Sequence, residues 1–458
     1  MDFQKLFAPQ SMAVLGVSLG NDRHPANVVY NKNRLRYPIK VFPVNPKGGV
    51  LQRRELYKRV ADIPDAVDLA VIAVRAAYAP AALKECIAAG VGAAVVMSGG
   101  FAESGRKDLQ DQMASMARAA DLPLIGPNCL GLYAPGRFDT FFLPSERMVQ
   151  PGQGNVALIS QSGGILVDQM INFASESVGL SLAFSIGNKA VINEVALLEH
   201  LAEHSQTEVI AFYVEGFDQN GGLEFVRSAS RCPKPVIVFK SGRSPEGSRA
   251  VSSHTASLAG DYQIFSKVLS QYGIVEARTQ FELVSFCGSL SRYQTPIEGR
   301  VGIITLSGGH GAVAVDLCRA HGLRVPPLSK GLQTEIRKAL SPSIQDIASL
   351  GNPVDLTGSV VDDDFVVAAE TLSRSPEIDC IILLVLPYAP GTTSDLGARL
   401  SRVYQREGTP LMAYVPHVEK YRMLIDGFEL NRVPVSPAIE GAVMMAEALR
   451  RYQKQSVK

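Results

Sequence analysis

Short apolar runs rich in β-branched residues alternate with helix-forming stretches along the whole chain, and this alternation constrains the fold more than any other feature. Parallel strands that are covered by helices on both faces have this pattern. The sequence therefore predicts an α/β protein. The expected strands are 12–18, 40–46, 68–74, 93–99, 123–128, 155–160, 180–187, 209–216, 234–242, 301–307, 380–387 and 410–416.

Two polar breaks divide this series of strands. Residues 143–154 and 291–300 carry proline, glycine and polar residues without hydrophobic periodicity, which is typical of joints between domains. A chain of 458 residues is also long enough for several domains. We therefore expect three consecutive α/β units, at 1–142, 150–293 and 299–458.

Composition excludes some classes of partner. With 45 basic and 44 acidic side chains the net charge is +1, so no broad electrostatic field would attract a nucleic acid or an anionic membrane. The strongest apolar run, 380–387, is too short to span a membrane, and the first ten residues lack a targeting pattern. Six scattered cysteines without a CxxC pair indicate reduced thiols. We expect a cytoplasmic protein.

One tripeptide, Ser-Gly-Gly, follows an apolar strand in each unit, beginning at Ser98, Ser162 and Ser307. At the carboxyl end of a parallel strand two glycines allow a tight turn into a helix, which leaves free N–H groups and the positive end of the helix dipole. That geometry suits phosphate, so Ser98 with Gly99, and Ser162 with Gly163 and Gly164, are candidate phosphate-binding residues. The alternative is a turn without a ligand.

The first unit offers a second candidate group for an anionic ligand. Its first strand ends at Gly16 and Ser18 without a GxGxxG pattern, which argues against a dinucleotide fingerprint. Lys47 follows the next strand and would reach the same crevice, where a lysine can neutralise phosphate. A solvated surface lysine is the alternative. No GxxxxGK[ST] occurs, so the chain has no P-loop for a nucleoside triphosphate.

His254 lies in the stretch VSSHTASLAGD, which predicts a loop of small and hydroxyl-bearing residues. A neutral imidazole attacks phosphorus readily, and the hydroxyl groups around it could donate to phosphoryl oxygens. Glu215 follows the strand 209–216, where a carboxylate could take the proton on one ring nitrogen. An ordinary turn histidine is the alternative.

The remaining histidines favour structural roles. His200 and His204 share a helical face at a metal-compatible spacing, but no third ligand is near in sequence, so exposed helix surface is favoured and no metal site is predicted. His310 would stand at a helix start. The stretch 185–190, SIGNKA, reads only as a glycine turn.

Taken together, these motifs resemble the α subunit of ADP-forming (NDP-forming) acyl-CoA synthetases, in the succinyl-CoA synthetase superfamily. The resemblance covers essentially the whole chain and is carried by VFPVNPKGG, LIGPNCLG, ISQSGG, SIGNKA, YVEG, SSHTASLAG, LSGGHGA and GNPVDLTG. It implies an N-terminal Rossmann-like CoA-binding domain followed by two flavodoxin-like CoA-ligase domains.

The resemblance also implies roles for matching positions. His254 would carry the phosphoryl group, Glu215 would orient it, and the helix start at Ser162 to Gly164 would bind phosphate. Gly16, Ser18, Lys47, Ser98 and Gly99 would hold CoA. The implied reaction converts acyl-CoA, ADP and phosphate into carboxylic acid, ATP and CoA through an acyl phosphate and a phosphohistidine.

A partner is implied as well, because the family's nucleotide-grasping domain is absent from this chain. ADP or ATP with Mg²⁺ is expected on an ATP-grasp β subunit in an α2β2-like assembly. Ala256 and Ser257 replace a common glycine and alanine beside the histidine, and Val167 stands where succinyl-CoA synthetases carry a tyrosine, which disfavours succinate. A CoA-binding regulatory protein without turnover is the alternative, and a nicotinamide-dependent oxidoreductase is disfavoured.

Overall fold

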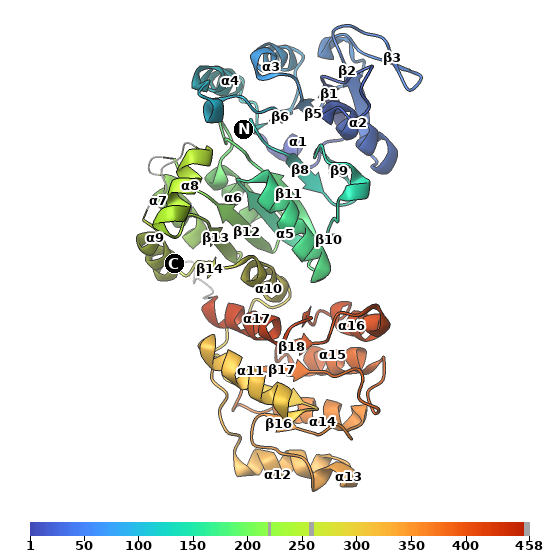
Figure 1. Ribbon diagram of the computed structural model, residues 1–458, viewed down its shortest axis with the longest axis vertical. Helices are drawn as coiled ribbons and strands as arrows, with labels where there is room; N and C mark the ends of the chain where they lie inside the picture. The colour runs from blue at the N-terminus through green and yellow to red at the C-terminus, as the bar shows by residue number, and fades with distance from the viewer. Residues whose placement is uncertain (219–220, 256–260, 453–458) are drawn as a thin grey trace. The chain divides into compact units, whose positions relative to one another are not determined.

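The computed structural model describes residues 1–218, 221–255 and 261–452, and the side chains of 252–255 lie outside this description. The strands form three sheets that are wholly or mainly parallel and one two-stranded hairpin, which confirms the predicted α/β class (Figure 1). Contacts divide the chain into two compact units, Met1–Glu276 and Ala277–Ser456. The first unit contains two of the sheets.

The first sheet has the strand order β2-β1-β5-β6-β7, all parallel. Alternate residues along its strands face two different clusters of buried side chains. Ala13 and Ala70 belong to the cluster with helices α3 and α4, and Met12 and Val71 belong to a cluster shared with α2 and the second sheet. The elements are α1 (Gln4–Phe7), β1 (Ser11–Leu15), α2 (Pro25–Arg36), β2 (Lys40–Val44), β3 (Val50–Leu51), β4 (Arg54–Glu55), β5 (Leu69–Ile72), α3 (Ala79–Ala88), β6 (Ala93–Val96), α4 (Lys107–Ala119) and β7 (Leu124–Ile125).

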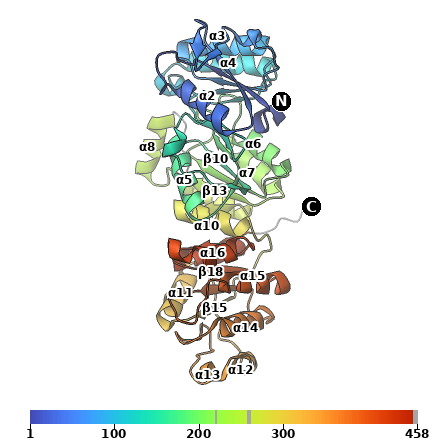
Figure 2. The same cartoon turned by 90° about the vertical axis from the view of Figure 1, so that its right-hand side faces the viewer.

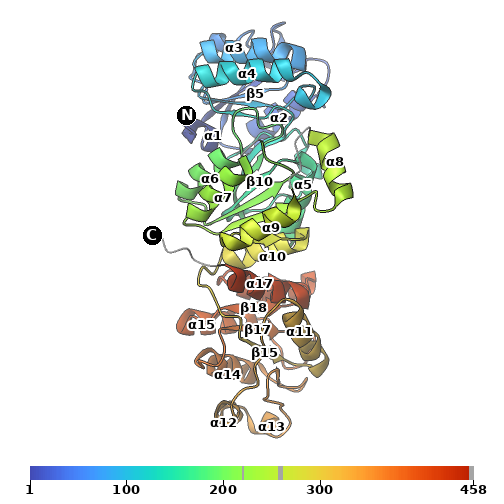
Figure 3. The ribbon, with the colours of Figure 1, turned by 90° about the vertical axis from the view of Figure 1, so that its left-hand side faces the viewer.

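The second sheet has the order β14-β13-β12-β10-β11-β8-β9, in which β8 runs antiparallel to β11. Helices α5 and α8 lie on one side of this sheet and α6 and α7 on the other (Figures 2 and 3). Its elements are β8 (Gly131–Ala134), β9 (Phe138–Asp139), β10 (Gln153–Ser160), α5 (Gly163–Ser175), β11 (Leu180–Ser185), α6 (Glu194–Glu203), β12 (Val209–Val214), α7 (Gly221–Arg231), β13 (Val236–Lys240), α8 (Pro245–Thr255), α9 (Tyr262–Gln271) and β14 (Val275–Ala277).

The third sheet, in the second unit, is parallel with the order β16-β15-β17-β18-β19. Helices α11 and α17 pack together, and α10 packs on α17. The elements are α10 (Gln280–Leu290), β15 (Val301–Thr305), α11 (Gly308–Ala320), α12 (Lys330–Ala339), α13 (Pro342–Gln345), β16 (Val354–Asp355), α14 (Asp362–Ser373), β17 (Cys380–Leu384), α15 (Leu396–Glu407), β18 (Leu411–Tyr414), α16 (Arg422–Glu429), β19 (Val435–Ser436) and α17 (Ile439–Arg451).

The strands that the sequence pattern misses are short or lie at sheet edges. They are β3, β4, β8, β9, β14, β16 and β19, of two to four residues each. Two of them, β8 and β9, fall within the predicted first domain but belong to the second sheet. Similarly, α10 falls within the predicted second domain but lies in the second compact unit.

Two further observations concern the described residues. None of their helices is both long and apolar enough to cross a membrane. The six cysteines are free, and all but Cys232 are buried, which agrees with the predicted reduced core thiols.

Candidate active site

The turn from β10 into α5 has the geometry that the Ser-Gly-Gly pattern predicts. Ser162 is the N-cap of α5, and its hydroxyl accepts a hydrogen bond from the N–H of Ile165 at 3.4 Å. The hydroxyl of Ser160 donates to the carbonyl oxygen of Ser162 and fixes the turn. The N–H groups of Gly163 and Gly164 begin the helix, where no carbonyl of the same helix can accept from them. They are available to an anion.

Glu215 is held beside this turn by the residue that precedes Ser162. The side-chain oxygen of Gln161 accepts hydrogen bonds from the N–H groups of Glu215 and Gly216. Its side-chain nitrogen donates to the carbonyl of Gly216 at 2.7 Å and to the carboxylate of Glu194. The buried Gln161 amide thus ties the start of α5 to the end of β12, and brings together two of the predicted site groups.

Two lysines complete the support of the same turn. Lys189 donates to Glu194 and to the carbonyl of Gly216, both at 2.8 Å. Lys240, at the end of β13, donates to the carbonyls of Glu215 and Ser241 at 2.6 Å. Burial lowers the pKa of the Lys240 ammonium to about 8. Hydrogen bonds therefore hold both the N–H groups and the carbonyl groups of Glu215 and Gly216.

The backbone of His254 lies in the last turn of helix α8, and the predicted loop is therefore wrong for residues 251–255. A proline and a glutamate open this helix, and the hydroxyl of Ser244 accepts from the N–H of Gly247 at 3.0 Å, so the local sequence favours a helix start. The His254 side chain, with Ala256 and Ser257, lies outside the described residues. Helix α8 is on the same side of the sheet as α5 (Figures 2 and 3).

The structure brings the predicted loops at Gly16, Ser18 and Lys47 together. The side chain of Asn45 donates to the carbonyl of Val17 at 2.6 Å and accepts from the N–H of Lys47 at 2.9 Å. Gly16 has a φ of +98°, and a Cβ there would lie 2.5 Å from the carbonyl oxygen of Ala73, so only glycine fits. Lys47 is exposed.

The turn at Ser98 and Gly99 differs from the predicted pattern, because no α-helix begins there; a 3₁₀ helix, Ala102–Ser104, follows instead. The carboxylate of Glu103 accepts from the N–H groups of Gly100 and Phe101. Burial alone would raise the pKa of Glu103, but hydrogen bonds from Asn188 and these N–H groups lower it. A phosphate at this turn would compete with that carboxylate.

The SIGNKA stretch is more than a glycine turn. Asn188 donates to Glu103 at 2.5 Å and to Gln110 at 3.0 Å, and its N–H donates to the carbonyl of Pro127 at 2.9 Å. Gly187 has a φ of +55°, and a Cβ there would lie 2.3 Å from the carbonyl oxygen of Asn128. The stretch therefore connects the loops of the first sheet to the Lys189 and Glu194 pair of the second.

A cavity of about 480 Å³ joins these parts. It lies between the turns that follow β6 and β7, the segment after β9, and the start of α5. Gly99 from a predicted CoA loop and Gly163 and Gly164 from the predicted phosphate turn all line it. The other lining residues are Met97, Asn128, Cys129, Leu130, Phe142, Leu143, Gln161, Ser162 and Val167.

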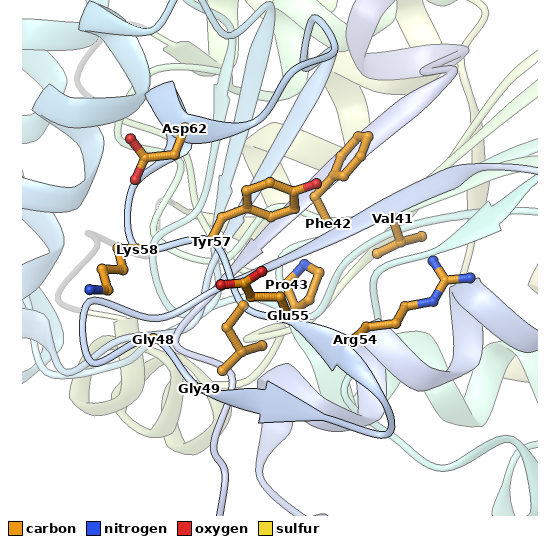
Figure 4. Close-up of a pocket in the computed structure, with 11 residues that line it drawn as sticks. Val41, Phe42, Pro43, Gly48, Gly49, Arg54, Glu55, Tyr57, Lys58 and Asp62 are labelled. Atoms are coloured by element: carbon orange, nitrogen blue, oxygen red, sulfur yellow. The ribbon is translucent and has the colours of Figure 1, made fainter.

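A second cavity, of about 660 Å³, lies between the edge strand β2 and the β3–β4 hairpin (Figure 4). Arg54, Glu55, Tyr57, Lys58 and Asp62 contribute polar groups to it. A Cβ on Gly48 would lie 2.9 Å from the Lys58 side chain. Lys58 is therefore a second cation at the turn that carries Lys47.

The structure corrects the expectation for His200 and His204, which are half-buried rather than exposed. The ring of His200 stacks on Phe3 at 4.6 Å between centroids, and His204 meets Phe7 edge-on at 5.7 Å. Burial lowers the pKa of both imidazoles. Among the described residues no group of three or more His, Cys, Asp or Glu side chains could hold a metal ion.

Sequence reasoning missed six polar residues of this region: Gln161, Lys189, Glu194 and Lys240, which support the Glu215 turn, and Glu103 and Asn188, which join the two sheets. Their positions carry one usable signal, since all but Glu194 lie within a few residues of a strand end or a glycine turn. Long-range hydrogen bonds such as that from Lys240 to the Glu215 carbonyl have no local pattern.

Comparison with known proteins places this geometry in a family. Residues 10–135 match the CoA binding domain and residues 153–290 match the succinyl-CoA ligase like flavodoxin domain. The alpha subunit of acetate–CoA ligase [ADP-forming] I from Pyrococcus furiosus is 33% identical over 100% of this chain and 99% of its own length. The chain belongs to the family of ADP-forming acetate–CoA ligase alpha subunits.

Two other similar proteins show the breadth of this family. A 4-hydroxybutyrate–CoA ligase [ADP-forming] from Nitrosopumilus maritimus is 30% identical over 98% of this chain and 64% of its own length. A solved structure of a dinucleotide-forming acetyl-coenzyme A synthetase 1 from Ca. Korarchaeum cryptofilum, in complex with phosphate and ADP, has a TM-score of 0.87 and 30% identity. The match covers 98% of this chain and 97% of the chain in that structure.

Proposed function

We propose that this chain is the phosphohistidine-carrying α subunit of an ADP-forming acyl-CoA ligase. The overall reaction would be acyl-CoA + ADP + phosphate ⇌ carboxylic acid + ATP + CoA. The observation that carries this proposal is the Gln161 amide, which holds the Glu215 turn directly beside the start of α5, the candidate anion-binding turn. Family membership supplies the reaction class.

The first step would form an acyl phosphate. A phosphate oxygen attacks the thioester carbonyl, the carbon–sulfur bond breaks, and CoA leaves as the thiol or thiolate. The N–H groups of Gly163 and Gly164, together with the positive end of the α5 dipole, would stabilise the phosphate charge. The loops at Gly16, Ser18, Lys47, Ser98 and Gly99 would hold CoA, with Lys47 and Lys58 near its phosphates.

The second step would transfer the phosphoryl group to this chain. A ring nitrogen of His254 attacks phosphorus, the bond between phosphorus and the acyl oxygen breaks, and the carboxylic acid is released. The Glu215 carboxylate would accept the proton of the other ring nitrogen and orient the imidazole. The phosphohistidine would then pass its phosphoryl group to ADP.

The nucleotide would bind a partner subunit. The chain has no P-loop sequence, and the Pyrococcus furiosus relative is named as an alpha subunit, so we propose an ATP-grasp β subunit with Mg²⁺ in an α2β2-like assembly. The chain alone should neither hydrolyse ATP nor form acyl-CoA.

Labelling tests the proposal directly. The chain and its partner are incubated with [γ-³²P]ATP, and the label on this chain is expected at His254, acid-labile and base-stable. His254→Ala should abolish the label and acyl-CoA formation while CoA binding persists; His24→Ala, at the N-cap of α2, is the matched control. Label that survives in His254→Ala would overturn the mechanism, and turnover without any label would do the same.

A further inference from the structure

Two neighbouring residues of the SIGNKA stretch serve different parts of the candidate site. Gly187 and Lys189 both have a positive φ, of +55° and +47°, so the backbone turns sharply on either side of Asn188. The ammonium of Lys189 donates to the carbonyl of Gly216, which also accepts from the Gln161 amide. The side chain of Asn188 reaches instead to the segment after β6 and to α4. Two adjacent side chains thus contact segments that follow strands of two different sheets.

The Asn188 amide contacts two side chains that lie against Gly99. Its nitrogen donates to Glu103 at 2.5 Å, and its oxygen accepts from Asn128 at 3.3 Å. A Cβ on Gly99 would lie 3.2 Å from the side-chain oxygen of Asn128 and 3.4 Å from the carboxylate of Glu103. That carboxylate in turn accepts from the two N–H groups that follow Gly99. The place of this turn therefore depends on an amide from the part of the chain that forms the second sheet.

We propose that Asn188 is a positioning residue for the thioester step, because its amide holds the turn at Gly99 in place relative to the phosphate turn at Ser162. This inference rests on the proposed function. The thioester step needs both turns, since the reacting atoms of CoA and phosphate must come within roughly 3–3.5 Å of each other. Phosphoryl transfer to His254 needs only the phosphate turn. Loss of the Asn188 amide should therefore slow the first of these steps and not the second.

Charge makes the contact between Asn188 and Glu103 directional. Burial alone would raise the pKa of the Glu103 carboxyl group, but hydrogen bonds from Asn188 and from backbone N–H groups lower it, so the group is ionised at neutral pH. An ionised carboxylate only accepts hydrogen bonds, and the nitrogen of the amide is the atom that donates to it. The contact therefore requires a donor at position 188 and an acceptor at position 103, and an exchange of these roles should preserve it.

The test measures the two steps separately in the assembled enzyme. The thioester step is followed in reverse with CoA and either acetyl phosphate or butyryl phosphate, whichever wild type uses faster. The sulfur of CoA attacks the acyl carbon, the bond from that carbon to the phosphate oxygen breaks, and inorganic phosphate leaves with the thiol proton. Phosphoryl transfer is followed as labelling of His254 from [γ-³²P]ATP, which needs no acyl group.

Asn188→Leu should lower kcat of the thioester step by roughly 100-fold, the loss that a misplacement of about 1 Å can cause. The KM for CoA should change far less, because the loops at Gly16 and Lys47 still hold the ligand. The rate of His254 labelling should stay unchanged. Gln112→Leu, which replaces an exposed amide on α4, is the matched control and should alter neither step.

An exchange of donor and acceptor provides the second test. Asn188→Asp places two carboxylates against each other and should slow the thioester step at least as much as Asn188→Leu. The double variant Asn188→Asp, Glu103→Gln restores one donor and one acceptor, so it should recover most of the lost kcat. Thermal unfolding identifies any variant that fails to fold, and Asn188→Leu alone then decides.

The outcomes separate this inference from the proposed function. If Asn188→Leu slows both steps equally or slows neither, Asn188 does not position the turn at Gly99 for the thioester step. A folded double variant that recovers none of the lost kcat overturns the inference as well. Wild type that forms no acyl-CoA from either acyl phosphate, or no label from ATP, would instead overturn the proposed function.

Discussion

The residue that most directly controls the candidate site is Gln161. All of its amide hydrogen-bonding groups are used: the oxygen accepts from two backbone N–H groups, and the nitrogen donates to Gly216 and Glu194. Such a fully used buried amide has a single orientation, because the opposite orientation would place donor against donor. The direction in which Glu215 leaves β12 therefore depends on a side chain from the turn that follows β10.

Replacing Gln161 with Met should slow phosphoryl transfer without preventing folding. Loss of the Gln161 hydrogen bonds would displace Glu215. A misplacement of about 1 Å can reduce the rate roughly 100-fold. We expect a fall of that size in the rate of His254 labelling, with the affinity for CoA nearly unchanged. Gln153→Met, at the exposed start of β10, the strand that precedes Gln161, is the control. An unchanged labelling rate in Gln161→Met would show that the clamp does not position Glu215.

Lys240 makes a prediction about pH. An unfolded lysine keeps its proton to about pH 10.5, whereas burial lowers the pKa of folded Lys240 to about 8. Unfolding between these values takes up a proton, so this residue makes the free energy of unfolding rise with pH from about 8 to 10.5. Urea unfolding at several pH values should show this rise reduced in Lys240→Met and retained in Lys267→Met, which changes an exposed lysine. Equal slopes in both variants would contradict the assignment.

At the scale of elements, the contact between α2 and β9 includes a buried ion pair. The side chains of Lys32 and Asp139 are 3% and 0% exposed. Asn33, the next residue on α2, adds hydrogen bonds to both the N–H and the carbonyl of Asp139. Helix α2 covers the first sheet while β9 belongs to the second, so this pair connects the two sheets of the first unit.

Removing one partner of the ion pair should lower the free energy of unfolding more than removing both partners. Lys32→Met leaves the Asp139 carboxylate buried without its cation, which we expect to lower the free energy of unfolding by about 3–5 kcal/mol. The double variant Lys32→Met, Asp139→Asn should regain part of that loss, because no charge remains buried. Denaturant unfolding of both variants measures the difference. A double variant less stable than Lys32→Met would argue against a desolvation cost.

The elements also show where sequence reasoning succeeds. Long buried strands such as β10 and β12 and the helix start at Ser162 are local signals, because hydrophobic runs and glycine turns act over a few residues. The strands β8 and β9, the clamp at Gln161 and the contact between Gly187 and Asn128 depend on partners far away in sequence. The sequence predicts a loop for residues 251–255 of α8 because the serines and threonine there favour turns, whereas the first turn of this helix supplies a cap and a proline.

At the scale of the whole molecule, the compact units differ from the predicted domains. Helix α10 has nine of its eleven residues buried and packs on α17. The sequence break at 291–300 suggests that the third domain begins after it, but the contacts assign it to the second unit. The contacts therefore group α10, which precedes the polar segment, with the predicted third domain, and the domain boundaries themselves stay a prediction.

Fragments of the chain test this division. A fragment that begins at Ala277 keeps α10 on α17, whereas one that begins at residue 299 exposes the apolar face of α17. We expect the longer fragment to unfold cooperatively at a clearly higher urea concentration, because it retains the burial of α10. Circular dichroism during urea titration measures both midpoints. Equal midpoints would mean that α10 contributes nothing to the unit.

The strands β8 and β9 leave the first sheet's part of the chain and complete the second sheet. This arrangement limits how such a protein can be recombined in evolution or in the laboratory. A chimera whose crossover lies in the polar stretch near residue 142 would combine β8 and β9 from one parent with β11 from another. The antiparallel pairing of β8 with β11 would then join strands from two different proteins. Residues 124–192, which include β7, these strands and the SIGNKA turn, are expected to be inherited as one block.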